Sequence, residues 1–226
     1  VPKDIDPHSY ESLVEFIEDC FEKYSDLPAF ECMGKAITFN ELDSLSYQFA
    51  AFLQNELKLK KGERIAIQMP NLLQYPIAAF GALRAGLVIV NTNPLYTPRE
   101  MEHQFKDSGA KAIVILANFA SNLQKIMHNT EIEHVIVTEI GDQLGGLKGK
   151  IVNFVVKNIK KMVPAYSLPQ ATKFNAALKT GARYNLDKPT MKGTDTACLQ
   201  YTGGTTGVSK GAVLSHTNLV ANLEQM

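Results

Sequence analysis

The sequence predicts an α/β fold, in which a mainly parallel sheet is flanked by helices, and three observations lead to that prediction. Short runs rich in β-branched residues recur between residues 64 and 138, and amphipathic stretches of helical spacing separate them. Strands joined by helices of this length pair in parallel, with the helices on the faces of the sheet. Apolar residues make up 45% of the chain and charged residues 20%, which is typical of a globular protein with a core.

The first 60 residues are expected to add two helices and a hairpin. Ser9 is predicted to cap a helix because apolar residues follow it at three- and four-residue spacing: Leu13, Phe16, Ile17, Cys20, Phe21 and Tyr24. Two strand-like runs at residues 29–33 and 36–39 surround Gly34 and predict a tight hairpin. Asn40 is then predicted to cap a second amphipathic helix that ends near Leu57.

The alternation of strand and helix is clearest in the middle of the chain. Thr97 and Glu100 form the pattern of a capping box, with Pro98 at the first helical position. The predicted strands are 64–69, 87–90, 111–116, 134–138 and 196–201, and the helices between them are 72–85, 98–107 and 118–128. Regularity is lost between residues 141 and 192. We therefore expect an α/β subdomain over residues 1–192, and over 193–226 a strand, a loop and a helix that open the next subdomain.

The charge balance and the cysteines restrict the class of protein. The chain has 23 basic and 23 acidic residues, so no overall field attracts nucleic acid, and no nucleic-acid partner is expected. The three cysteines, Cys20, Cys32 and Cys198, match no metal or redox spacing and indicate reduced, buried thiols. No apolar run approaches the roughly 20 residues that span a bilayer, and the first residues do not resemble a secretory signal. A cytoplasmic protein is expected.

Residues 151–163 form a basic amphipathic stretch with two interpretations. Lys157, Lys160 and Lys161 fall on one face, and the other face is apolar through Ile151, Val152, Val155, Val156, Ile159, Met162 and Val163. A surface helix whose apolar stripe covers the domain core would show this pattern. So would a helix that rests on a membrane surface or lines the entrance for an apolar substrate.

The strongest functional signal is a glycine-rich stretch after the predicted strand 196–201. Polyphosphate needs many converging N–H donors, and backbone groups converge only where side chains are absent. Glycines supply that space, hydroxyls add donors or Mg²⁺ ligands, and Lys210 adds positive charge. The residues of this predicted phosphate-binding loop are Tyr201, Thr202, Gly203, Gly204, Thr205, Thr206, Gly207, Val208, Ser209, Lys210, Gly211 and Ala212.

Two common phosphate loops are excluded by the spacing. A P-loop places lysine directly after glycine, whereas Lys210 follows Ser209, and the GxGxxG fingerprint is not matched. A flexible turn between a strand and a helix is the alternative structural interpretation. Four glycines, four hydroxyl residues and a lysine within ten positions favour phosphate binding over a plain turn.

The stretch YTGGTTGVSKGAVLSH is similar to the phosphate-binding signature of the adenylate-forming superfamily, which includes acyl-CoA synthetases, luciferases and peptide-synthetase adenylation domains. Residues 69–76, 83–93 and 94–100 resemble bacterial long-chain fatty acid–CoA ligases in particular, and residues 141–144, 152–163 and 218–226 fit the same group. The resemblance covers essentially the whole chain. It implies the N-terminal subdomain of the adenylate-forming fold, and therefore an incomplete one.

This resemblance implies that a fatty acid, ATP and CoA are the substrates. A fatty acid would be converted first to acyl-AMP and then to acyl-CoA, with release of pyrophosphate and AMP. Thr202 to Lys210 would wrap the β- and γ-phosphates, and Thr202 would be a ligand of Mg²⁺. The family's residues for adenine, ribose and CoA, and its catalytic lysine, would lie beyond Met226. We therefore expect this chain to be inactive alone, and we assign no catalytic residue.

Other functions remain open at this point. A related enzyme could activate another carboxylic acid or use a carrier protein as acceptor, and a non-catalytic nucleotide-binding or membrane-docking module is a third alternative. Peripheral contact with the inner membrane surface and a homodimer are further options. His103 and His216 are expected to have surface or capping roles, because no metal-ligand spacing surrounds them.

Overall fold

A computed structural model of the chain describes residues 9–202 and 209–225. Among these residues the main element is a seven-stranded sheet with the order β7-β6-β5-β3-β4-β8-β9. Six neighbouring strands are parallel, and β9 pairs antiparallel with β8. The predicted α/β fold with a mainly parallel sheet is confirmed. The strands of this sheet are β3 (Arg64–Gln68), β4 (Val88–Asn91), β5 (Ala110–Leu116), β6 (His134–Thr138), β7 (Thr172–Lys173), β8 (Thr196–Thr202) and β9 (Lys210–Ser215).

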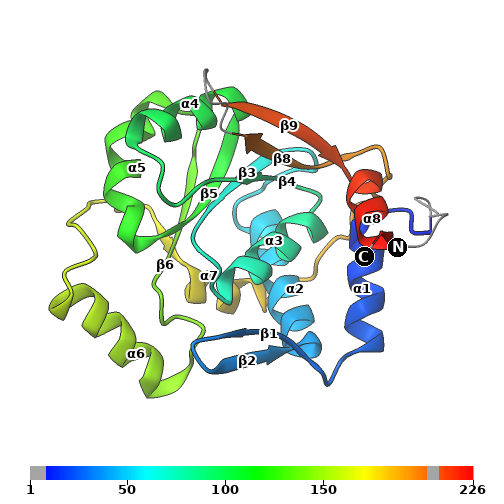
Figure 1. Cartoon of the computed structure of the whole chain (residues 1–226), viewed down its shortest axis with the longest axis horizontal. Coiled ribbons are helices and arrows are strands. Elements are labelled where there is room, and N and C mark those ends of the chain that lie inside the picture. The colour runs from blue at the N-terminus through cyan, green and yellow to red at the C-terminus, as the bar shows by residue number, and fades with distance from the viewer. Residues whose placement is uncertain (1–8, 203–208, 226) are drawn as a thin grey trace.

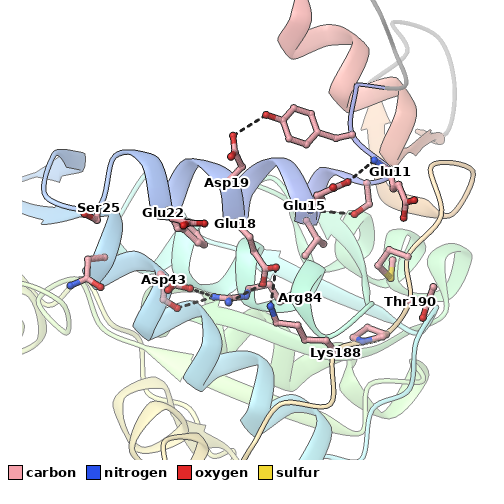
Figure 2. A pocket seen from close by; sticks show the side chains of 17 residues that line it. Glu11, Glu15, Glu18, Asp19, Glu22, Ser25, Asp43, Arg84, Lys188 and Thr190 are labelled. Atoms are coloured by element: carbon pink, nitrogen blue, oxygen red, sulfur yellow. Dashed lines mark hydrogen bonds and ion pairs between the residues drawn. The ribbon is translucent and has the colours of Figure 1, made fainter.

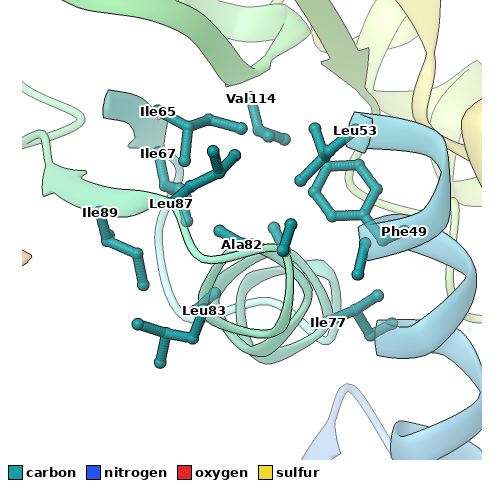
Figure 3. Close-up of a cluster of buried hydrophobic side chains, with 14 of the residues drawn as sticks. Phe49, Leu53, Ile65, Ile67, Ile77, Ala82, Leu83, Leu87, Ile89 and Val114 are labelled. Atoms are coloured by element: carbon teal, nitrogen blue, oxygen red, sulfur yellow. The ribbon is translucent and has the colours of Figure 1, made fainter. Parts of the chain in front are cut away.

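Helices cover both faces of the sheet (Figure 1). Alternate residues of each strand point to opposite faces, so Ile65 and Ile67 of β3 join one core and Ala66 joins the other. The first core packs against α1 (Leu13–Lys23), α2 (Phe39–Asn55), α3 (Gln74–Arg84) and α7 (Phe174–Gly181). The second core packs against α4 (Pro98–Ser108) and α5 (Ala120–Ile126). Figure 3 shows the first core, where Phe49 and Leu53 of α2 face β3 and β5.

Two of the predicted helix caps are wrong by a few residues. Ser12, not Ser9, caps α1, because its side chain accepts a hydrogen bond from the N–H of Glu15. Thr38, not Asn40, caps α2, and in return the Thr38 N–H donates a hydrogen bond to the carboxylate of its partner Glu41 at 2.9 Å. A reciprocal capping box satisfies two orphan N–H groups, whereas a lone cap satisfies one. The capping box predicted at Thr97 is confirmed at the start of α4.

The region predicted to be irregular, residues 141–192, contains three elements. The basic stretch forms α6 (Gly146–Phe154), which continues as a π-helical turn over Val155–Ile159. β7 and α7 follow, and α7 packs closely on α2 because Gly181 leaves no side chain against the carbonyl of Gln48. The spacing of Phe174, Ala177 and Leu178 is helical and could have predicted α7.

The apolar stripe of the basic stretch covers little of the core. Ile151, Ile159 and Met162 are more than half exposed, at 52%, 64% and 54%, and so are the neighbouring Phe154 and Leu147. Val152, Val155 and Val156 are half-buried, and Val163, just after the helix, packs against the second core. The interpretation of this stretch as a cover for the domain core is therefore supported only at Val163. No helix among residues 9–202 and 209–225 is both long and apolar enough to cross a membrane.

The sequence predicted that the loop after β8 leads directly into a helix, and this is wrong. The chain returns as β9, and only then begins α8 (His216–Glu224), which Ser215 caps. β8 pairs with β4, so the sheet continues without interruption across the subdomain boundary that was predicted at residue 192. The assignment of residues 193–226 to a second subdomain stays a prediction.

A buried arginine joins three of the helices on the first face, α1, α2 and α3. The Arg84 side chain at the end of α3 is 5% exposed, and its guanidinium lies 2.6 Å from a carboxylate oxygen of Asp43 and 3.0 Å from one of Glu18. Figure 2 shows Arg84 pointing between α1 and α2, with these carboxylates on either side. The rings of Phe21 and Tyr47 also lie within 6 Å of the guanidinium. The charge is thus paired and hydrogen-bonded, as a buried charge must be.

Candidate functional site

The strand order places a crevice at the carboxyl ends of β3 and β4. The chain leaves β3 for α3 on one face of the sheet, and leaves β4 for α4 on the other face. Neighbouring strands whose connections diverge in this way leave a gap above the sheet edge, where α/β proteins bind ligands. The fold therefore predicts a binding site next to the end of β8, which pairs with β4.

A cavity of about 410 Å³ occupies this position. Its walls come from three segments: the ends of β3 and the turn after it, the end of β4 and the turn after it, and the end of β8. The lining residues are Ile67, Met69, Asn71, Tyr75, Asn91, Thr92, Asn93, Tyr96, Gln200 and Tyr201. Two of these segments overlap the stretches 69–76 and 83–100, and the third is the end of β8, so three stretches that are separate in the sequence meet at one cavity.

Neutral polar side chains form the floor of this cavity. The Tyr75 hydroxyl donates to the Asn91 side-chain oxygen at 2.7 Å, and the Asn91 amide donates to the Gln200 side-chain oxygen at 3.1 Å. Gln104 of α4 donates to the carbonyl of Asn91 at 2.9 Å and fixes the end of β4. Burial raises the pKa of Tyr75, so its hydroxyl stays protonated and keeps donating.

The predicted phosphate loop begins and ends at this edge of the sheet. Thr202 pairs with Lys210 across the β8–β9 hairpin, and both residues are exposed. Ser209 precedes Lys210 and is half-buried. The predicted site residues Gly203, Gly204, Thr205, Thr206, Gly207 and Val208 lie outside the described part of the chain. The structure thus brings Thr202, Ser209 and Lys210 together beside the cavity.

Tyr201, Gly211 and Ala212 belong to the strands that carry the loop. The Tyr201 ring lies across Gly211, where an added Cβ atom would come within 3.0 Å of the ring. The absence of a side chain at Gly211 therefore leaves room for this buried aromatic ring. Burial, and then the hydrogen bond to Asp107, raise the pKa of the Tyr201 hydroxyl well above its ordinary value. Contact of these three residues with a nucleotide stays a prediction.

Neither histidine has the simple surface role that was one expectation, but His216 does make a capping contact, because it accepts a hydrogen bond from the first N–H of α1. The His103 side chain on α4 is half-buried, with Nε2 3.1 Å from the carbonyl oxygen of Ser209. His216 is fully buried at the start of α8, and its Nδ1 accepts a hydrogen bond from the N–H of Leu13 at 3.2 Å. Ser215, the preceding residue, is the actual cap of α8.

A protein-only metal site is absent from the described residues. No group of three His, Cys, Asp or Glu side chains is placed to hold a metal ion within residues 9–202 and 209–225. The exposed hydroxyl of Thr202 is an oxygen donor of the kind that Mg²⁺ accepts. It fits Mg²⁺ as a single ligand, with the remaining ligands supplied by phosphates and water.

Comparison with known families gives the decisive observation. The model of the family described as AMP-binding enzyme matches residues 17–226, which is more than nine-tenths of the chain. The chain belongs to the AMP-binding enzyme family. Two similar relatives are a long-chain-fatty-acid–CoA ligase of Yersinia pestis, 57% identical over 225 residues, and one of Haemophilus influenzae, 52% identical over 223 residues. These matches cover 100% and 99% of this chain, which spans about 40% of the length of each relative.

A solved structure shows the same fold for this AMP-binding family member. The anthranilate CoA ligase AuaEII in complex with anthranoyl-AMP superimposes with a TM-score of 0.76 at 19% identity. The superposition covers 94% of this chain and 37% of AuaEII. The sheet and its helices therefore form part of the adenylate-forming fold.

Sequence reasoning predicted a phosphate loop in this AMP-binding family member but did not predict the cavity at the ends of β3, β4 and β8. Asn91, Tyr75 and Gln200 are neutral side chains with no motif chemistry of their own. A signal existed, because Asn91 directly follows the predicted strand 87–90 and Gln200 lies near the end of the predicted strand 196–201, and the carboxyl ends of parallel strands meet at one edge. Tyr96 lies in the stretch 94–100, and its side chain forms part of the cavity wall.

Proposed function

We propose that this chain is the N-terminal part of an ATP-dependent long-chain fatty acid–CoA ligase. The observation that carries the proposal is the 57% identity to the Yersinia pestis ligase over the whole chain. The site supports it, because Thr202 and Lys210, which flank the glycine- and hydroxyl-rich stretch in sequence, lie at the end of β8 next to a crevice of the kind where α/β proteins bind nucleotides. The activity belongs to the complete protein that contains this chain.

In the proposed reaction a fatty acid carboxylate attacks the α-phosphorus of ATP. The bond to the β-phosphate oxygen breaks, which gives acyl-AMP and pyrophosphate, and the CoA thiolate then attacks the acyl carbon and displaces AMP. Thr202, the loop 203–208, Ser209 and Lys210 contribute by binding the β- and γ-phosphates. The Lys210 ammonium offsets the negative charge that pyrophosphate gains as it leaves. No described residue is assigned a role as general acid or base.

Mg²⁺ bound with ATP would neutralise phosphate charge and fix the conformation of the triphosphate. Thr202 is the candidate protein ligand in this chain, because its hydroxyl stands at the end of β8 where the loop begins. A Thr202→Ser variant keeps the oxygen and a Thr202→Val variant removes it. Only the valine variant of the complete protein should require more Mg²⁺ for half-maximal ATP–pyrophosphate exchange.

ATP–pyrophosphate exchange by the complete protein tests the function directly. Acids of increasing chain length should stimulate exchange, with long-chain acids the best and benzoate or anthranilate poor. Lys210→Ala should lower exchange about 100-fold, because one charge-stabilising contact in a water-excluded site contributes roughly 3 kcal/mol. The exposed Lys60→Ala is the matched control and should leave exchange unchanged. If an aromatic acid were the best substrate, the long-chain assignment would be wrong, and the related-enzyme alternative would replace it.

We also propose that α6 and the turn after it contact an anionic membrane surface. Between Asp142 and Asp187 the sequence has eight basic residues and no acidic one, so this segment carries a local positive charge that the neutral whole conceals. Its exposed apolar side chains, Leu147, Ile151, Phe154, Ile159 and Met162, are interspersed with those lysines. Lys148 donates to the carbonyl of Met33, so the tip of the β1–β2 hairpin (Pro28–Cys32 and Lys35–Thr38) lies beside α6.

Vesicle flotation of the complete protein tests this contact. Vesicles with anionic lipid should bind the protein, and the triple variant Lys157→Glu, Lys160→Glu, Lys161→Glu should bind at least tenfold more weakly, because each lysine near such a surface contributes about 1 kcal/mol. The control carries the same charge change at exposed lysines elsewhere: Lys23→Glu, Lys60→Glu and Lys125→Glu. Equal losses in both variants would indicate a general charge effect and would contradict a contact through α6.

A further inference from the structure

Both ends of the phosphate loop are bonded to one helix. Before the loop, the Tyr201 hydroxyl of β8 donates to a carboxylate oxygen of Asp107 at 2.5 Å. After the loop, the carbonyl oxygen of Ser209 lies 3.1 Å from Nε2 of His103. His103 and Asp107 are both on α4, where a separation of four residues places them on the same face.

We propose that His103 and Asp107 are positioning residues, which hold Tyr201 and Ser209 on either side of the predicted loop and thereby place the adjacent Thr202 and Lys210 for the phosphates of ATP. This proposal rests on the proposed function for the identity of the ligand. Groups that bind phosphate lose conformational entropy when the ligand orders them, and this loss reduces the affinity. Two anchors on a rigid element reduce that loss before ATP arrives.

The helix that carries these two residues is held firmly at both ends and along its buried face. Thr97 and Glu100 form its capping box, and Gly109 ends it in the left-handed conformation with φ 59°. Met101 and Phe105 are fully buried in the second core. α4 is therefore a fixed reference to which the hairpin of β8 and β9 is attached.

The chemistry of the two contacts differs. A carbonyl oxygen can only accept, so Nε2 of His103 must carry a proton to bond Ser209. Tyr201 donates to a carboxylate, which makes a short, charge-assisted hydrogen bond. The Tyr201 ring is buried with 7% exposure and lies over Gly211, so the hydroxyl is aimed at Asp107 by packing. The Tyr201 side chain also lines the cavity, and this connects the anchor to the ligand site.

Paired variants of the complete protein separate an anchor from a packing group. His103→Leu and Asp107→Leu remove each hydrogen bond, whereas His103→Gln keeps an N–H donor and Asp107→Asn keeps an oxygen acceptor. The leucine variants should raise KM for ATP about tenfold, as expected when a charge-assisted or functionally aimed hydrogen bond is lost. KM for the fatty acid should change little, and the Gln and Asn variants should recover most of the ATP affinity.

Amide hydrogen exchange of the peptide covering residues 196–212 gives a second readout that needs no turnover. This peptide should exchange faster in both leucine variants and return toward the wild-type rate in the Gln and Asn variants. Lys106→Leu, an exposed change on the same helix between the two residues, is the control and should match the wild type in both measurements.

The proposal is overturned if the leucine variants keep both the wild-type KM for ATP and the wild-type exchange rate. It is also overturned if the conservative variants are as impaired as the leucine variants, because packing and not hydrogen bonding would then be responsible. Failure of the proposed function has a different signature. The wild type would show no ATP–pyrophosphate exchange with any acid, while the hydrogen-exchange difference between the variants could still be measured.

Discussion

His216 accepts a hydrogen bond from the backbone N–H of Leu13, and so the first residue of α8 is joined to the first residue of α1 across 203 positions of sequence. The acceptor is Nδ1, so the imidazole proton is on Nε2. Nε2 is buried and has no partner among the described residues. The imidazole is therefore neutral in the folded state, and protonation of Nδ1 would break the bond to Leu13.

This arrangement predicts a loss of stability at mildly acidic pH. Burial lowers the pKa of His216 below its ordinary value of 6.5, because the charged form is poorly solvated there. The unfolded chain takes up this proton near pH 6.5, so the contribution of His216 to stability is complete above that pH and is lost as the pH falls through the lower folded pKa. His216→Asn keeps an acceptor without a titration. Between pH 7.5 and 5.5 its Tm should fall less than that of the wild type.

A second histidine variant controls for general acid effects. His128 is exposed, and His128→Asn should follow the wild-type pH profile. If His216→Asn and the wild type lost Tm in parallel, titration of His216 would not be the cause of the acid sensitivity.

Replacement of Arg84 by methionine should destabilise the chain by about 3 kcal/mol, because a buried ion pair that loses one partner leaves the other charge uncompensated. Asp43 and Glu18 keep some solvent, with side-chain exposures of 43% and 28%, so the cost should fall at the low end for buried pairs. Urea unfolding measures the change. Lys106→Met breaks the exposed pair with Glu102 and should cost less than about 0.5 kcal/mol. Similar losses for both variants would contradict a special role for the buried pair.

Gly181→Ala should force α7 away from α2. A Cβ atom at this position would overlap the backbone carbonyl of Gln48, and backbone cannot yield as a flexible side chain does. Overpacking of this kind costs about 1–3 kcal/mol. Thermal unfolding of the variant should show a lower Tm, while the exposed Lys179→Ala on the same helix should be neutral. An unchanged Tm for Gly181→Ala would show that the two helices separate without cost.

Gly211→Ala tests the packing beneath the phosphate loop. The new methyl group would come within 3.0 Å of the Tyr201 ring, so the ring must shift and its hydroxyl must move relative to Asp107. We expect a loss of about 1–2 kcal/mol in unfolding free energy. Ala212→Gly, at the exposed neighbouring position of β9, removes a methyl group that packs on nothing comparable. A larger loss for Ala212→Gly than for Gly211→Ala would refute this account of Gly211.

The elements that could be predicted from sequence are those with local determinants. The strand at 134–138 agrees with β6 residue for residue, because an apolar run of β-branched residues stands between polar ends. The start of α4 was predictable since Thr97, Pro98 and Glu100 each favour the same helix boundary. Thr38 and Asn40 are both good caps, and only the reciprocal bond from Glu41 selects Thr38.

The parts that could not be predicted depend on distant contacts. Gly211 and Lys210 read as loop residues, but pairing with β8 draws them into a strand. His216 reads as a surface residue until α1 is placed over it. The sequence also does not show that apolar side chains of α6 are exposed, because the same apolar stripe would occur on a helix face that is buried against the core.

The pairing of β8 with β4 determines when the site can be assembled during folding. Asn91 and Gln200, which share a hydrogen bond in the cavity floor, are 109 positions apart in sequence, whereas β3, β4 and β5 are joined by short βαβ connections. Closing a long segment costs entropy before any contact is gained, so such pairings form late. During synthesis, β3, β4, β5 and β6 emerge from the ribosome before β8 does. The cavity at the ends of β3, β4 and β8 is then among the last parts to become native, and a chain arrested earlier would hold a folded half-sheet without it.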